Sequence, residues 1–543
     1  MMHKNRSIDI HQFTMVPRAE IPRSSFKMQH THKTTFDAGY LIPIYLDEVL
    51  PGDTFKVKMT AFTRLATPLY PTMDNLWLDS FFFFVPNRLV WTNWVKMMGE
   101  QRNPGDSISY VVPTMTSPAG GYAIGSLQDY MGLPTVGQMG GGATYTHAAL
   151  HTRAYNLIWN EWFRDENLQN SVTVDTGDGP DTASNYVLLR RGKRKDYFTS
   201  ALPWPQKGNT AVSLPLGTSA TIKTNPTALV SGAQTSVYFK KAADGTAPVA
   251  GATAVDAAGA FSDTATATGA VNGLYPSNLY ADLSTATAAT INQIRQAFQI
   301  QKLLERDARG GTRYIEILLS HFGVRSPDAR LQRPEYLGGG STPIIINPVA
   351  QTSGTNASGT TTPLGNLAAI GTGLARSHGF TQSFVEHGVI IGLVMVRADL
   401  TYQQGVRKMW NRSTRYDFYW PVFSHLGEQT ILNREIYADG SANDTGVFGY
   451  QERWAEYRNN PSKITSLFRS TAAHTLDGWH LAQKFTSLPT INSTFIQETP
   501  PVSRIVAVGA AADGQQFICD TFFDVNAVRP LPMYSVPGLI DHF

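Results

Sequence analysis

The stretch LWLDSFFFFVPNRLVW, residues 76–91, contains four consecutive phenylalanines, Phe81 to Phe84. Side chains alternate between the two faces of a strand, so four aromatic rings in a row require both faces to be buried, against a second sheet or a neighbouring subunit. The same run exposed to water would promote aggregation. The stretch therefore predicts a strand that is covered on both sides.

Other segments with strand-like patterns lie on either side of this run. Residues 51–62 (PGDTFKVKMTAF) follow a Pro-Gly turn and alternate apolar with polar side chains, which predicts a half-buried strand. Residues 387–402 (HGVIIGLVMVRADLTY) predict a buried strand, and residues 501–508 and 516–525 are further candidates. Strands near both ends of the chain are typical of one β-sandwich or barrel with enlarged loops, so the 543 residues can form a single domain.

Helical periodicity is confined to the middle of the chain. Apolar residues recur at spacings of three and four in residues 146–170 and 291–306, and a shorter helix is expected at residues 313–322, after Gly310 and Gly311. The expected fold is therefore mainly β, with several helices in the insertions between strands.

Three segments differ from the rest in composition. Residues 1–36 contain six Lys/Arg, four His and two acidic residues, with Pro17 and Pro22 interrupting any periodicity, which indicates an extended cationic arm or a solvated tail. In residues 209–290, 34 of 82 residues are Ala or Thr and seven are charged, so this segment is interpreted as an insertion. Residues 342–373, rich in Gly, Ser and Thr, are expected to form a long irregular loop.

The overall composition limits the possible functions. Charged residues make up 16%, below the roughly 25% of typical soluble domains, and the net charge is only +3, so any nucleic-acid contact must be local. The single cysteine, Cys519, excludes an internal disulfide and a cysteine-rich metal site. No export signal is expected at the start of the sequence. The longest apolar run, residues 388–396, is about half the length of a membrane-spanning helix.

A search for catalytic motifs finds no convincing site. His147 and His151 have the helical i, i+4 spacing of a zinc site but lack the glutamate and the third ligand. Asp175-Thr176-Gly177 resembles the loop of aspartic proteases, but it occurs once and continues into Asp178 and Asp181, so an acidic surface loop is favoured over weak calcium binding. Cys519, in an apolar strand-like segment, is interpreted as a small core residue.

One dense cluster of positive charge remains. Residues 190–195 (RRGKRK) place five cations in six positions, a density that attracts phosphates. A solvated loop explains the cluster equally well. The functional interpretations are a nucleic-acid contact, with nearby aromatic side chains stacking on bases, or a charged contact between subunits.

Several long strings identify a family resemblance. The chain resembles the major capsid protein of the Microviridae, in particular the gokushovirus branch of small single-stranded-DNA phages, over nearly its whole length. The strings are SFFFFVPNRLVW, AYNLIWNEWFRDENLQ, ARGGTRYIEILLSHFGVRSPDARLQRPEYLGG, YDFYWPVFSHLGEQ and the Pro-rich end, VRPLPMYSVPG.

This resemblance implies an eight-stranded antiparallel jelly roll, residues 37–543 in a single capsid domain, that self-assembles into a T=1 icosahedral shell around circular single-stranded DNA. It implies no catalysis and no cofactor. By position, residues 209–290 correspond to the insertion that forms a threefold protrusion and meets the host surface. The implied partners are further copies of the chain, an internal scaffolding protein, a small basic DNA-binding protein, a DNA pilot protein, the genome and a host receptor. The implied location is the virion, assembled in the host bacterial cytoplasm.

Candidates for the inner, DNA-facing side come from the arm and the basic cluster. They are Lys4, Arg6, Arg190, Arg191, Lys193, Arg194 and Lys195. Two alternatives stay open: a secreted carbohydrate-binding or carbohydrate-active β-sandwich, suggested by the many Trp and Tyr residues, and a fibre or spike, for which no repeat is present.

Overall fold

The computed structural model describes most of the chain. Four stretches are described continuously, residues 22–207, 332–352, 367–508 and 514–534. Shorter described pieces are residues 221–224, 239–241, 245–247, 253–255, 261–263, 272–276, 279–282, 291–310, 355–357 and 360–362. The predicted helix at residues 313–322 and the first part of the arm lie outside the described residues.

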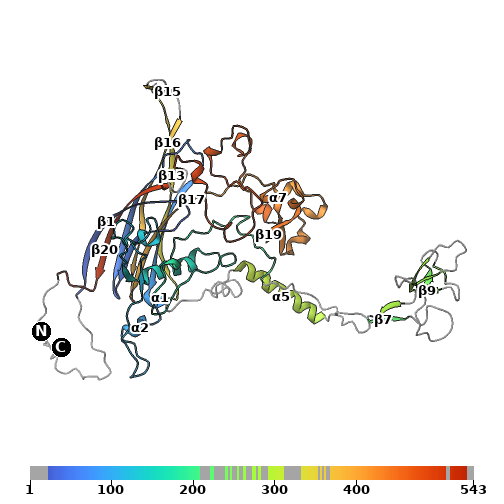
Figure 1. Ribbon diagram of the computed structural model, residues 1–543, viewed down its shortest axis with the longest axis horizontal. Helices are drawn as coiled ribbons and strands as arrows, with labels where there is room; N and C mark the ends of the chain where they lie inside the picture. Colours follow the sequence, from blue (N-terminus) through green and yellow to red (C-terminus); the bar gives the residue numbers. More distant parts are fainter. Residues whose placement is uncertain are drawn as a thin grey trace, which may run out of the picture. The chain divides into compact units, whose positions relative to one another are not determined.

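Eight long strands form one antiparallel sheet, in the order β1-β20-β3-β16-β13-β4-β17-β2 (Figure 1). Their bounds are β1 (Ser24–Phe36), β2 (Ile42–Val49), β3 (Thr54–Leu65), β4 (Leu76–Pro86), β13 (Glu335–Ala350), β16 (Leu367–Ser383), β17 (Gly388–Ala398) and β20 (Phe517–Arg529). The strands β1, β20, β3 and β16 make one half of this order, and β13, β4, β17 and β2 make the other. This order confirms the predicted eight-stranded jelly roll.

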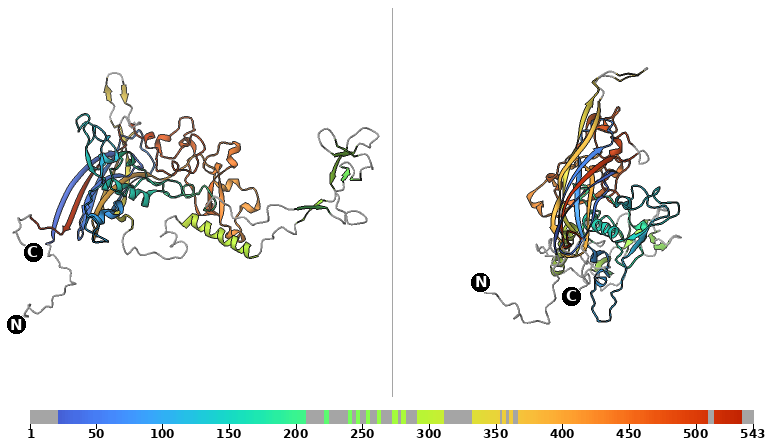
Figure 2. Two further views of the ribbon diagram at one scale, coloured as in Figure 1. Left: turned by 60° about the horizontal axis from the view of Figure 1, so that its bottom comes forward. Right: turned by 90° about the vertical axis from the view of Figure 1, so that its left-hand side faces the viewer.

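The first and last of these strands lie side by side, as Figure 2 shows for the blue β1 and the red β20. Their pairing runs from Ser24 opposite Arg529 to Phe36 opposite Phe517. The expected arm at residues 1–36 is therefore too long, because residues 24–36 form a strand. The reason is the partner: β20 supplies a full set of backbone hydrogen bonds that a scan for apolar residues does not reveal.

The alternation in β3 shows how the sequence forms the core. Phe55, Val57, Met59 and Ala61 are at most 1% exposed, whereas the residues between them face outward or are half-buried. The inward side chains join a core that both halves of the sheet share. The prediction for residues 51–62 is thus confirmed.

The phenylalanine run is buried on both faces, as predicted. Phe82 and Phe84 of β4 belong to the core between the two halves of the sheet. Phe83 and Val85 point the other way, into a second core that includes side chains of α4 (Leu150–Ile158). The second face is covered by the insertion after β4 rather than by a second sheet or a neighbouring subunit.

The Gly/Ser/Thr-rich segment is not the irregular loop that its composition suggested. Half of residues 342–373 belong to β13 and β16, which pair with each other, and β14 (Thr355–Ala357) pairs with β15 (Thr360–Thr362) between them. A Cβ atom added to Gly371 would lie 2.8 Å from the Cβ of Leu65, so glycine there permits close packing within a strand.

Two further expectations require correction. Residues 501–508 contain a 3-10 turn, η11 (Val502–Arg504), because Val502 and Ile505, three residues apart, both face the core. The helix expected at residues 146–170 is shorter: residues 146–148 form strand β6, and α4 continues only as a π-helical turn, η2 (Trp159–Phe163). The strand predictions at residues 387–402 and 516–525 are confirmed by β17 and β20.

The remaining short elements lie in the insertions of the same unit. The strands are β5 (Thr114–Thr116), β6 (Thr146–Ala148), β18 (Glu428–Leu432) and β19 (Val447–Glu452). The α-helices are α1 (Asn87–Val90), α2 (Trp94–Met97), α3 (Leu127–Tyr130), α7 (Asn433–Ile436) and α8 (Ala455–Arg458). The 3-10 turns are η3 (Ala183–Asn185), η5 (Lys408–Asn411), η6 (Arg415–Asp417), η7 (Pro421–His425), η8 (Ala442–Thr445), η9 (Ser466–Phe468) and η10 (Asp477–Trp479).

Residues Gln206–Phe322 form a second compact unit. Its helix α5 (Ile291–Gly310) confirms the helix predicted at residues 291–306. Its strands are β7 (Thr221–Thr224), β8 (Phe239–Lys241), β9 (Thr253–Val255), β10 (Phe261–Asp263), β11 (Asn272–Pro276) and β12 (Leu279–Asp282). Among the described residues of the chain, no helix is long and apolar enough to span a bilayer.

Candidate functional site

The residues considered for catalysis or metal binding serve structural roles. His147 lies in β6, before α4 begins, so the helical spacing to His151 assumed from the sequence is wrong. The His147 Nε2 atom lies 2.8 Å from the Tyr122 hydroxyl. Across the described residues, no group of three or more His, Cys, Asp or Glu side chains could hold a metal ion.

The acidic loop after residue 174 anchors the cover of the sheet. Asp178 accepts hydrogen bonds from the Trp91 indole (2.7 Å) and from Asn93, and these bonds lower the pKa of its carboxyl group. Asp181 is buried and forms a bidentate ion pair with Arg153, at 2.5 and 2.8 Å. Only part of the segment is thus the acidic surface loop that the sequence suggested.

Cys519 is the small core residue that the sequence predicted. Its side chain is buried, 3.3 Å from the Thr63 hydroxyl, and burial raises the pKa of the thiol to about 11. A thiol with so high a pKa is a poor nucleophile at neutral pH.

The first two arginines of the basic cluster point into the protein. Arg190 donates to the carbonyl oxygens of Ala38 (3.0 Å) and Glu498 (3.1 Å), and its guanidinium lies 3.8 Å from the centre of the Tyr40 ring. Arg191 donates to Asp79 Oδ2 at 2.9 Å.

Asp79 is the centre of a buried charge network. This carboxylate on β4 also accepts from Arg397 Nε of β17 (2.8 Å) and from the Ser341 hydroxyl of β13 (2.5 Å). Two arginines and one hydroxyl therefore surround a single buried carboxylate. Through Arg191, the network connects the basic cluster to three neighbouring strands.

Lys193 is also internal, with 6% of the residue exposed. Its ammonium donates to Gln483 Oε1 at 3.0 Å and lies 4.6 Å from the Phe495 ring centre. Burial lowers the pKa of Lys193 to about 8 and raises the pKa of nearby Glu498 to about 7. The residue contributes to packing under the insertions rather than to an accessible cationic surface.

Only Arg194 and Lys195 of the cluster are exposed. The Lys195 ammonium contacts the Asp165 carboxylate and donates to Thr199 O at 3.2 Å, yet 57% of its side chain stays accessible. Lys4 and Arg6 lie outside the described residues. Among the described candidates, therefore, the charge available to a phosphate backbone is concentrated on these two side chains.

A different surface is conspicuous for its exposed apolar side chains. We call it the aromatic surface, and it consists of Met409, Trp410, Tyr416, Phe418, Tyr419, Trp420, Val422 and Leu426. Each of these residues is at least 45% exposed, and Trp410 and Val422 reach 73% and 84%. Soluble monomers seldom expose so many large apolar side chains together, so such a patch indicates an interaction site.

The aromatic surface is held rigidly. A capping box links Thr414 and Asp417, and backbone hydrogen bonds from Thr414 lower the pKa of Asp417 to about 2. The Trp420 indole donates to Arg415 O at 2.9 Å. An ion pair between Arg412 and Glu456 (3.2 Å) ties the segment to α8. A surface ordered before binding loses less conformational entropy on association.

A recess of about 410 Å³ opens beside this surface. Trp410 and Tyr457 line it together with Arg407 and Lys463. A pocket next to exposed aromatic side chains is typical of the energetically dominant centre of a protein interface.

Sequence reasoning did not identify the aromatic surface. Residues 416–429 served only as one string of the family resemblance. The available signal was a dense run of aromatic residues that follows neither the period of a strand nor that of a helix. No regular element can bury such a run on one face.

Comparisons with known proteins agree with this picture. Residues 14–539 match the family described as capsid protein (F protein). The chain is 49% identical to the capsid protein VP1 of Bdellovibrio phage phiMH2K, over 98% of both chains. It is 44% identical to the capsid protein VP1 of Chlamydia phage 1 and 37% identical to that of Spiroplasma virus 4, with the same coverage.

Proposed function

Because this chain belongs to the phage family of capsid proteins (F protein), we propose that its copies assemble into a T=1 icosahedral shell that encloses circular single-stranded DNA. Membership makes the chain a structural component of the virion. The capsid class is thereby favoured over the carbohydrate-active alternative, and no enzymatic activity is proposed.

The observation that carries the proposal is the aromatic surface on a closed jelly-roll core. The core is complete within one chain, because both faces of β4 are covered by the chain's own residues. The exposed rings therefore remain available to neighbouring copies, and an interface of this kind gains its affinity from buried aromatic anchors.

The test is to express the full-length chain with its scaffolding partner and to examine nuclease-treated material by sedimentation and negative-stain microscopy. Closed shells of one small, uniform diameter that protect single-stranded DNA are expected. A discrete monomer or dimer that never closes would contradict the proposal.

We propose the same accessory partners that the resemblance implies. These are an internal scaffolding protein, a small basic DNA-binding protein, a DNA pilot protein and a host receptor. For the genome, the candidate contacts are Lys4, Arg6 and the exposed pair Arg194 and Lys195. The three remaining cluster residues, Arg190, Arg191 and Lys193, would act indirectly by holding that pair in place.

The insertion at residues 209–290 is proposed as the threefold protrusion that meets the host. Its composition and its position within a separate compact unit, Gln206–Phe322, support this role. Deletion of residues 210–287 should leave shells closed, flatten the knobs at the threefold axes and reduce adsorption to host cells. Electron microscopy and an adsorption assay measure these effects, and surviving knobs would refute the assignment.

A further inference from the structure

The outward face of the four strands β1, β20, β3 and β16 combines positive charge with exposed aromatic rings. The outward face of the other half of the sheet packs into the second core, with α4 and its neighbours. The first face carries exposed cations at Lys27, Lys33, Lys56, Lys58, Arg64 and Arg376. Its acidic residues are Asp520 and Asp524, both on β20.

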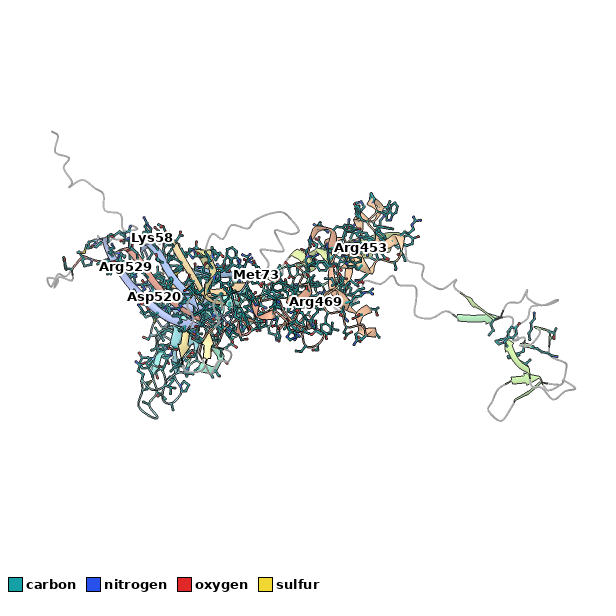
Figure 3. The ribbon with its side chains drawn as sticks, turned by 90° about the horizontal axis from the view of Figure 1, so that it is seen from above. Lys58, Met73, Arg453, Arg469, Asp520 and Arg529 are labelled. Atoms are coloured by element: carbon teal, nitrogen blue, oxygen red, sulfur yellow. The ribbon has the colours of Figure 1, made fainter. Side chains whose placement is uncertain are left out.

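The six cations of this face outnumber its two acidic residues, and the register places Asp524 opposite Lys58. Lys33 pairs with Asp520 at 3.4 Å, and Asp524 accepts a hydrogen bond from Gln29. Within the described part of the chain, Lys56, Lys58 and Arg64 form no ion pair. Figure 3 labels Lys58 and Asp520 on strands of the sheet, and Arg453 and Arg469 in the segment that lies away from the sheet.

Two phenylalanines lie among these cations. Phe62 on β3 is 48% exposed, and Phe522 on the adjacent β20 is 41% exposed. The register places Phe62 opposite Asp520 and Phe522 opposite Thr60, so the two rings are diagonal neighbours on one face. Lys58 and Arg64 flank this pair along β3.

We infer that this face binds single-stranded DNA, with bases stacked on Phe62 and Phe522 and phosphates neutralised by Lys56, Lys58 and Arg64. Stacking needs no sequence preference, because every base has a π face, and four-stranded sheets with exposed aromatics are an established architecture for binding unpaired strands. Duplex DNA offers no free base faces at this site. The inference rests on the proposed function and deepens it by naming where the genome is held.

Charge argues for DNA rather than for a second copy of the same face. Protein interfaces are depleted of lysine, and two identical cationic faces would repel each other. A contact with a different region of a neighbouring copy is an outcome that the experiment distinguishes.

The experiment measures binding of a labelled oligothymidylate strand to the full-length chain by fluorescence anisotropy, over a range of salt concentrations. The double variant Phe62→Thr/Phe522→Thr should bind about 100-fold more weakly, about tenfold for each lost stacking contact. Phe62→Tyr/Phe522→Tyr, which keeps both rings, should bind as the wild type does. The triple variant Lys56→Gln/Lys58→Gln/Arg64→Gln should reduce the slope of log affinity against log salt by about 2, since each phosphate contact on a single strand contributes about 0.7.

The matched control removes three exposed cations from elsewhere, as Arg102→Gln/Lys302→Gln/Lys484→Gln, and should change binding little. A duplex of the same length should show no loss with the Phe62→Thr/Phe522→Thr variant. Circular dichroism verifies that each variant is folded.

The outcomes separate the inference from the proposed function. If the wild type binds the strand and all variants bind equally, this face is not the site, although the shell proposal stands. If wild-type shells form without nucleic acid and the chain does not bind the strand, DNA enclosure fails and the inference fails with it. If the face variants keep DNA binding but lose assembly, the face is a contact between copies and the inference is overturned.

Discussion

Replacing Arg153 by methionine is expected to lower the free energy of unfolding by about 3–5 kcal/mol. Arg153 is completely buried, and its guanidinium donates to both oxygens of Asp181 and to the carbonyl oxygens of Val90 and Gly177. Among the residues that the structure describes, the variant leaves the buried Asp181 carboxylate with only the Tyr186 hydroxyl as a close side-chain donor. Urea unfolding of the unassembled chain measures the change.

Two controls separate the buried charge from a general effect of substitution. The double variant Arg153→Met/Asp181→Leu removes both charges and should recover a large part of the lost stability, because no unpaired carboxylate remains. Lys33→Gln removes an exposed ion pair, with side chains 70% and 50% accessible, and should change stability by less than about 1 kcal/mol. A loss after Arg153→Met no larger than that after Lys33→Gln would contradict the explanation.

Replacing Val422 by glutamate is expected to prevent shells from closing while leaving the subunit folded. Val422 is an 84% exposed member of the aromatic surface, so the substitution causes no strain within one chain but places an unpaired charge in the proposed interface. A loss of 2 kcal/mol at a contact of this kind raises the concentration needed for association about 30-fold. Sedimentation velocity, with circular dichroism as the folding control, measures both effects.

Val385→Glu is the matched control, since Val385 is 88% exposed and does not belong to the aromatic surface. This variant should still form shells. Equal loss of assembly in both variants would show that an added charge at any exposed valine is sufficient, and closed shells from Val422→Glu would refute the role of the aromatic surface.

The strands with a regular pattern were predictable from local sequence. The alternation in β3 and the unbroken apolar run in β17 each specify which faces are buried, and the structure agrees. The four phenylalanines of β4 required two buried faces for the same reason. These predictions succeed because the pattern of apolar side chains that decides which faces of a strand can be buried is visible within a few residues.

Segments whose order depends on distant partners were not predictable. Residues 24–36 are mostly polar, and they form a strand because β20, nearly 500 positions later, pairs with them. Residues 342–350 belong to the segment 342–373, which was predicted to be a loop from its overall Gly, Ser and Thr content, yet β4 and β16 supply their hydrogen bonds. Whether a segment will pair with a distant strand cannot be deduced from the composition of that segment alone.

The basic cluster likewise has one property that the sequence predicts and others that only the tertiary structure reveals. The string RRGKRK showed that the cluster is dense in positive charge. It did not show that three of the five cations would donate hydrogen bonds inside the protein, to two backbone carbonyls, to Asp79 and to Gln483. Conversely, Lys56, Lys58 and Phe62 share one face of β3 by strand alternation alone, but Phe522 joins them only when β3 pairs with β20.

The sequence by itself therefore determined the β-rich class, the buried strands and the family, because these follow from side-chain periodicity and from long shared strings. The tertiary structure decided which charges are buried, which aromatic rings remain exposed, and which strands lie side by side. Those properties depend on contacts between residues hundreds of positions apart, and the free energy of burying a charge or a ring is set by its neighbours in space rather than in sequence.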